Sequence, residues 1–273
     1  MLSIHQVKEM CQRYFDEEVY KHRLKDKENV ICKISFPTAK EHYLNMAKSG
    51  QYGDVETAEE LMGAIEHDYI FTDSFMSSRY MGCMSEEEGK FVSEVEIPED
   101  HLYRMLYQCY ELNTDLETEV VDPSDDEFIT DTDILQYLNY AIRHEVGHIA
   151  HHYELGINDG YTDEYIEECS DDLAAYQDAT NENWCDFNDD KITEKECIIV
   201  NMHNYYSMLE EREANRYAGI EGDILEQFIN LEWKVFVQHN RDRYTPNCNL
   251  DFYSDDEDQE YDFRTVSGDE VDG

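Results

Sequence analysis

The chain has 273 residues, of which 65 are acidic and only 21 are Lys or Arg, so its formal net charge is −44. Such a negative surface repels the phosphates of nucleic acids, so we expect no direct binding to DNA or RNA and favour basic partners. The length is sufficient to bury a core, and no apolar run approaches the roughly 20 residues that a membrane-spanning helix needs.

The cysteines and the N-terminus indicate a reducing compartment. Eight cysteines are scattered without a C-x-x-C pair, and the opening MLSIHQVKEM lacks the apolar segment of a secretory signal. We therefore expect a cytoplasmic protein. The negative charge itself fits solubility, adaptation to high salt, or a specific basic partner, including mimicry of nucleic acid.

The region 1–125 is predicted to contain helices and a few strands, with no feature that suggests a role. Ser3 and Gln6 form a capping box that predicts a helix over about the first 25 residues. Alternating or continuous apolar residues predict strands at 29–37 and 90–98. Further helices are predicted at 38–48, at 57–67 and from Pro98 onward.

The region 126–250 is predicted to form a second, largely helical unit, which makes the fold class α+β and mainly helical. An acidic loop at 113–133 leads into it, and Thr130 with Asp133 can cap the helix that follows. The remaining predictions are a helix at 131–153, a helix at 161–179, a loop at 181–191, a helical run at 193–238 broken near Gly219–Gly222, and a disordered acidic tail at 251–273.

The helix at 131–153 contains His144, Glu145 and His148, which form an H-E-x-x-H motif. Residues four apart lie on one face of a helix, so both imidazoles can bind a single Zn²⁺. The carboxylate of Glu145 lies beside them and can take a proton from a water molecule that zinc activates. The motif therefore predicts a hydrolytic zinc site that lacks one ligand.

Two downstream segments can supply the third ligand. In YIEECSDDLAAY, Glu167 or Glu168 lies about twenty residues beyond His148. In YYSMLEEREANRYA, Glu211 is followed by Asn215 one helical turn later, where an amide can hydrogen-bond a metal-bound histidine. The residues alone leave both segments open.

HEVGHIAHH together with EREANRYA resembles the gluzincin-type zinc metallopeptidases, in particular the ImmA/IrrE-type and related phage and mobile-element enzymes, whose second motif reads E-x-E-A-N/D-x-F/Y-A. The resemblance implies a zincin-like core, with His144, His148 and Glu211 as zinc ligands and Glu145 as general base. Glu213 would belong to the motif without touching the metal. This similarity covers about 90 residues and leaves the N-terminal region unassigned.

The spacing departs from this pattern, because 62 residues separate His148 from Glu211, more than that family usually has. A second resemblance, to thermolysin, would place the third ligand in an E-x-x-S-D segment. Glu167 to Asp171 matches those letters, although the flanking N-E is absent. The choice between Glu211 and Glu167 or Glu168 therefore stays open at this point.

We expect a zinc-dependent metallopeptidase acting on a protein or peptide substrate, with a basic DNA-binding protein as a plausible target. The alternative is an acidic interaction protein or nucleic-acid mimic whose zinc site is structural or vestigial. His203, Tyr205 and Tyr206 are candidates to stabilise an oxyanion. His151 and His152 are expected at the solvated end of the helix.

Overall fold

The structure is a computed structural model, which describes residues 2–27, 29–38, 41, 77–81, 91–118, 128–157 and 162–237. The helices predicted at 38–48 and 57–67 fall almost wholly outside these residues, and the tail predicted at 251–273 falls entirely outside them.

A three-stranded mixed sheet contains the strands in the order β1-β3-β2. β1 (Val30–Ser35) runs parallel to β3 (Phe91–Glu96), and β2 (Ser77–Met81) pairs with β3 in the antiparallel direction. β1 and β3 confirm the two predicted strands. β2 was not predicted, because its sequence SSRYM has no clear alternation of apolar and polar residues.

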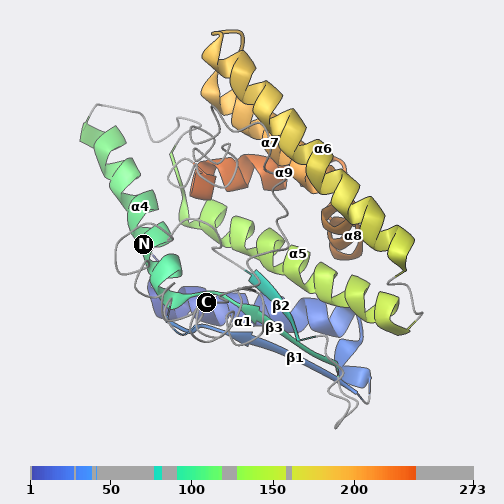
Figure 1. Ribbon diagram of the computed structural model, residues 1–273. Coiled ribbons are helices and arrows are strands. Elements are labelled where there is room, and N and C mark those ends of the chain that lie inside the picture. The colour runs from blue at the N-terminus through green and yellow to red at the C-terminus, as the bar shows by residue number, and fades with distance from the viewer. Residues whose placement is uncertain are drawn as a thin grey trace, which may run out of the picture.

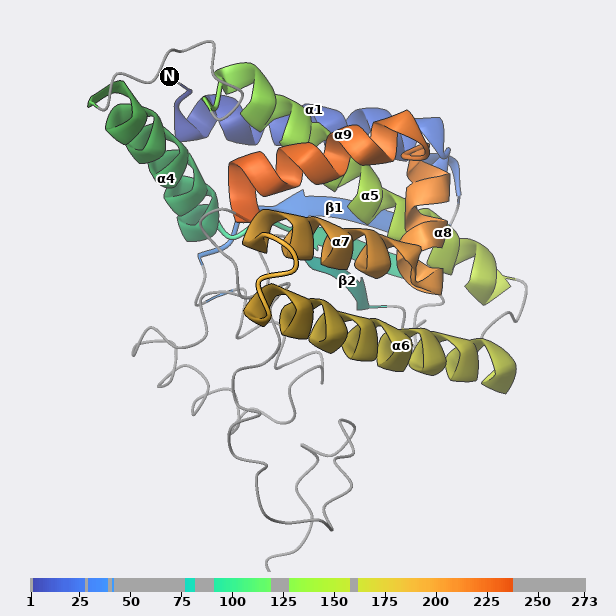
Figure 2. The same cartoon turned by 90° about the horizontal axis from the view of Figure 1, so that it is seen from above.

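The helices surround one long central helix, α5 (Asp131–Ile157) (Figure 1). α1 and the sheet lie on one side of α5, and the helices that follow it in the chain lie on the other (Figures 1 and 2). The predicted class, α+β and mainly helical, is confirmed. The other helices among the described residues are α1 (Ile4–Lys21), α4 (Glu99–Thr118), α6 (Asp163–Asn188), α7 (Glu194–Ser207), α8 (Leu209–Ala218) and α9 (Asp223–Glu232), with the 3-10 helix η1 (Leu24–Asp26) and the π-helix η2 (Trp233–Val237).

Capping motifs fix where several helices begin. At α1, the Ser3 hydroxyl accepts a hydrogen bond from the backbone N–H of Gln6, whose side chain accepts one in return from Ser3 N–H. Thr130 and Asp133 make the same reciprocal pair at α5, with distances of 2.8 and 3.1 Å. Both caps confirm the predictions, because these short polar side chains satisfy N–H groups that the helix leaves unpaired.

α6 extends to Asn188, so the loop predicted at 181–191 is wrong over most of its length. The polar Asn and Asp residues there suggested a loop, but packing against α7 keeps the segment helical. The Asn183 side-chain N–H donates to the side-chain oxygen of Asn201 on α7 at 2.7 Å, and Trp184 packs against the core. Tertiary contacts thus override a weak local preference.

The helical run predicted at 193–238 has two breaks. The one expected near Gly219–Gly222 is present, and Gly219 adopts a left-handed conformation (φ 68°) that ends α8. The other break, between α7 and α8 at Met208, was not predicted. There the side chain of Asp172 on α6 accepts a hydrogen bond from Leu209 N–H at 2.7 Å, which satisfies the exposed start of α8.

The hydrophobic core is continuous, and residues on both sides of position 125 contribute to it. The division into units at 1–125 and 126–250 stays a prediction. None of the helices within the described ranges is long and apolar enough to cross a membrane. Fully buried members of the core include Val7, Phe15, Leu102, Met105, Leu138, Ile142, Ile149, Ile198, Met202, Phe228 and Ile229.

Candidate metal centre

α5 brings the two histidines of the H-E-x-x-H motif together, as the spacing predicts. His144 and His148 are 5% and 7% exposed, and their Nε2 atoms are 3.1 Å apart. The rings meet edge to face, with centroids 4.7 Å apart. Two buried imidazole nitrogens therefore point to one place in the middle of the protein.

α8 brings Glu211 to the same place. Its Oε2 lies 2.9 Å from Nε2 of His144 and 3.4 Å from Nε2 of His148. By contrast, Glu167 and Glu168 on α6 are exposed and do not belong to the group that could hold a metal ion. Of the two segments that the sequence left open, the structure places the EREAN segment at the histidines.

The approach of α8 to α5 depends on Gly147, which lies between the two histidines. A Cβ atom added at Gly147 would lie 2.2 Å from the backbone oxygen of Ala214 on α8. Real Cβ atoms essentially never approach another atom within 3.0 Å, so the two helices touch backbone to backbone here. This contact lets the carboxylate of Glu211 reach the two imidazoles.

The Nε2 atoms of His144 and His148 and the Oε2 atom of Glu211 have the spacing of three ligands in a tetrahedral site. Zn²⁺ binds imidazole nitrogen and carboxylate oxygen at about 2.0–2.2 Å, so two ligands of a tetrahedron are about 3.3 Å apart. The observed separations of 2.9, 3.1 and 3.4 Å are close to that value, and the three side chains form a group that could hold a metal ion. Two neutral nitrogens and one carboxylate are also ligands that zinc favours.

Two further side chains fix the orientation of these ligands. The Oδ1 atom of Asn215, one turn after Glu211 on α8, lies 2.9 Å from Nδ1 of His144 and can accept a hydrogen bond from its N–H. That tautomer leaves Nε2 of His144 with a free lone pair. The Tyr205 hydroxyl donates to Oε1 of Glu211 at 2.9 Å, so Oε2 is the oxygen left to face the histidines.

The pKa values of Glu211 and His148 are both strongly shifted, because each buried group lies beside the other's charge. Burial on its own would raise the pKa of Glu211, but the neighbouring His148 and His144 hold it well below its usual range. Burial on its own would lower the pKa of His148, yet the Glu211 carboxylate raises it to about 9, with Glu145 and Glu210 adding to the effect. In the absence of metal, the site therefore holds an imidazolium beside a carboxylate.

Glu145, Glu213 and the three candidates for oxyanion stabilisation are not part of the His144, His148 and Glu211 group. Glu145 is half-buried, and its negative charge acts on His148. Glu213 pairs instead with Arg216 at 2.6 Å. Of the candidates for oxyanion stabilisation, Tyr205 hydrogen-bonds Glu211, and the ring of Tyr206 packs edge to face against His144 with centroids 5.5 Å apart. The buried Tyr206 hydroxyl donates to Glu232 at 2.5 Å, and His203 lies 3.5 Å from Glu226.

The expectation that His151 and His152 form a solvated helix end is wrong, because both are buried. His151 Nε2 lies 3.0 Å from the hydroxyl of Tyr165 on α6. Burial and the charges of neighbouring histidines lower the pKa of His152 to about 3, and Glu210 lies 3.9 Å from its Nε2. No local pattern indicates these contacts, because α6 and α8 cover this end of α5 only in the folded chain.

No protein-family model matches the chain, and neither a curated protein nor a solved structure is significantly similar to it. The function must therefore be inferred from the arrangement of these side chains.

Proposed function

We propose that the protein is a zinc-dependent metallopeptidase that hydrolyses peptide bonds of a basic protein substrate. One observation carries this proposal: the ligand atoms of His144, His148 and Glu211 lie within 4.8 Å of one another in a buried site. The contacts from Asn215 and Tyr205 support it, because they orient donor atoms toward a common point.

In this proposal Glu145 is the general base. Bound Zn²⁺ supplies Lewis acidity that polarises a carbonyl group and makes water more acidic. The Glu145 carboxylate takes the proton from the attacking water and passes it to the leaving amine. Its position directly after His144, its partial exposure and its electrostatic effect on His148 all support this role.

The expected substrate is basic because the chain carries a net charge of −44. Opposite charges increase the rate of encounter, and salt screens the attraction. If the charge serves this purpose, hydrolysis of Lys- or Arg-rich peptides should slow as ionic strength rises, whereas hydrolysis of acidic peptides should not.

Metal analysis and peptide hydrolysis test the proposal together. We expect one Zn²⁺ per chain, lost in His144→Ala and Glu211→Ala but kept in the control Glu168→Ala, which removes an exposed carboxylate. Glu145→Gln should keep zinc and lower the hydrolysis rate by about 10²–10⁴-fold. Retention of zinc by Glu211→Ala would refute the ligand set.

The rival proposal is an acidic interaction protein with a structural metal site. It predicts that zinc binds but that wild type and Glu145→Gln act identically, both in binding a basic partner and in failing to hydrolyse it. Hydrolysis by wild type that Glu145→Gln loses while keeping its zinc would exclude this rival.

A further inference from the structure

A cavity of about 330 Å³ opens beside the metal centre, between α6 and the junction of α7 with α8. Glu211 lines this cavity and also belongs to the group that could hold a metal ion, so the cavity and that group share one side chain. Most of its other walls are apolar. They include Ile166, Leu173, Met208 and Leu209.

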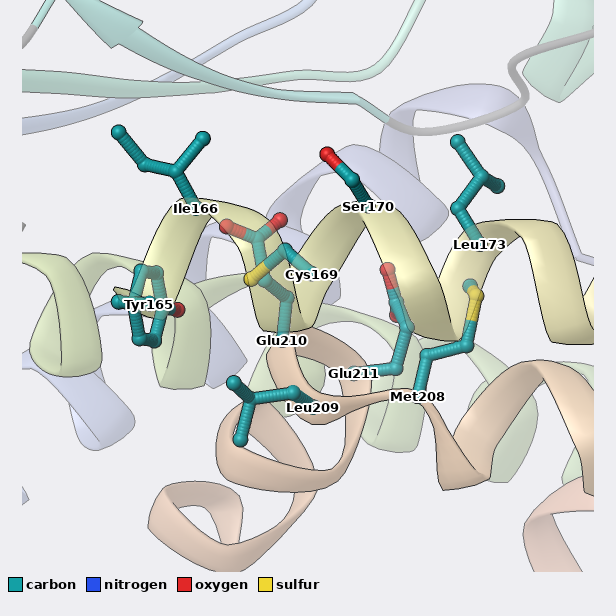
Figure 3. A pocket seen from close by; sticks show the side chains of 9 residues that line it. All are labelled: Tyr165, Ile166, Cys169, Ser170, Leu173, Met208, Leu209, Glu210 and Glu211. Carbon is teal, nitrogen blue, oxygen red and sulfur yellow. The ribbon is translucent and has the colours of Figure 1, made fainter. Parts of the chain in front are cut away.

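The α6 wall exposes apolar side chains that no described element covers. Ile166 and Leu173 are 47% and 46% exposed, although both are large and aliphatic. Figure 3 shows that they project with Ser170 from the same side of α6. Exposed apolar surface next to a cavity is typical of a ligand-binding site, because a bound apolar group would shield that surface and the cavity walls from water.

Contacts at both ends of this stretch hold the walls in place. Near one end, the hydroxyl of Tyr165 on α6 lies 3.0 Å from Nε2 of His151 on α5. Near the other, Asp172 accepts the hydrogen bond from Leu209 N–H at the start of α8. These contacts join α6 to α5 and to the start of α8, so the cavity between α6 and α8 is part of the fold.

The surroundings of the cavity are strongly acidic. Six of the first ten residues of α6 are Asp or Glu, and the whole helix contains no Lys, Arg or His. Glu167, Glu168 and Asp171 are exposed on this stretch, and Glu210 lines the cavity itself. An apolar cavity with an acidic rim suits an apolar side chain whose neighbours in sequence are basic.

We propose that this cavity is the specificity pocket of the enzyme, and that it binds a Leu-, Met- or Phe-like side chain next to the scissile bond while α6 binds flanking Lys or Arg residues. This inference rests on the proposed function, because only a peptidase has a scissile bond next to the pocket. The binding of such a peptide can nevertheless be measured without hydrolysis.

Binding of labelled peptides to the Glu145→Gln variant, with and without added Zn²⁺, tests the pocket by fluorescence anisotropy. One peptide carries a central Leu flanked by Lys, and its partner carries Ser in place of Leu. We expect Leu to tighten binding by about tenfold or more. Adding Ile166→Ser and Leu173→Ser should abolish that difference, whereas the control Ile224→Ser, at an isoleucine that is 37% exposed on α9, should preserve it.

A second pair of variants tests the acidic rim. Glu167→Gln with Asp171→Asn should weaken binding of the Lys-flanked peptide several-fold at low salt, and should not weaken binding of a Glu-flanked peptide, which loses a repulsion. Glu9→Gln with Glu17→Gln removes the same charge from α1, on the opposite side of the molecule from α6 (Figures 1 and 2), and should have a much smaller effect.

The outcomes separate this proposal from the proposed function. If wild type hydrolyses peptides but binds and cleaves the Leu and Ser peptides equally, the pocket is wrong and the enzyme stands. If the Leu preference depends on Ile166 and Leu173 but wild type hydrolyses nothing, the pocket stands and the peptidase is wrong. Equal loss of binding in Ile224→Ser would also overturn the pocket.

Discussion

Replacing Gly147 by Ala tests whether the backbone contact between α5 and α8 sets the metal site. The new Cβ would lie 2.2 Å from the Ala214 oxygen, which belongs to the backbone and cannot rotate away. To reach an ordinary contact, α8 must move by about 1 Å. Because Glu211 is on α8, that shift would move its Oε2 away from both histidines.

The magnitude follows from two opposing effects. Forcing an extra methyl group into a closely packed contact destabilises a protein by about 1–3 kcal/mol. Replacing Gly by Ala inside a helix, on its own, stabilises it by about 0.5–1 kcal/mol. Because the clash is with backbone, the upper half of the packing cost applies, and Gly147→Ala should lower the free energy of unfolding by about 1–2.5 kcal/mol. Displacing a ligand in this way should also weaken zinc binding by at least tenfold, as disturbed metal surroundings commonly do.

Gly156→Ala is the matched control, since it makes the same change in the same helix where nothing lies within 4 Å of the new Cβ. It should stabilise the protein by about 0.5–1 kcal/mol and leave zinc affinity unchanged. Urea unfolding in a chelator measures stability, and competition with a chromogenic chelator measures affinity. If the two alanine variants behave alike, α8 does not approach α5 as described.

Three more predictions concern the histidine and glutamate side chains of the candidate metal centre and the tyrosine that contacts them. Tyr205→Phe removes the hydrogen bond to Oε1 of Glu211, so zinc affinity should fall about tenfold without loss of fold, and an unchanged affinity would show that the hydroxyl does not position the carboxylate. His148 has a pKa raised from 6.5 to about 9 in the metal-free protein, so zinc binding at pH 7 should release about one proton, measurable by calorimetry in buffers of different ionisation enthalpy. The raised pKa of His148 stabilises the metal-free fold fully below pH 6.5, and this stabilisation is lost as the pH rises toward 9. Urea unfolding in a chelator at several pH values measures it. A constant free energy of unfolding over that range would contradict the His148–Glu211 ion pair.

Local sequence patterns predicted the parts of the fold whose determinants lie within a few residues. The capping residues Ser3 and Thr130 marked the starts of α1 and α5, and apolar patterns located β1 and β3. The pair His144 and His148 was equally accessible, because helix geometry alone brings residues four apart to one face.

Features that depend on distant partners could not be predicted in this way. The break at Met208 involves neither Gly nor Pro, and Asp172 on another helix satisfies the N–H group that it exposes. α6 continues past Asn183 because α7 packs beside it. Resemblance suggested Glu211 but left Glu167 and Glu168 open, since 62 residues separate Glu211 from His148 and no local rule measures that gap.

The position of α5 links the metal site to the integrity of the whole molecule. This one helix contacts α1, α8, α9 and the strands β2 and β3, and it also carries both histidines. The two imidazoles can separate only if α5 unfolds, and unfolding of α5 would remove the contacts at the centre of the protein. If the site binds a metal ion, its release during heating should therefore coincide with cooperative loss of structure, and the visible absorption of bound Co²⁺ would report global unfolding.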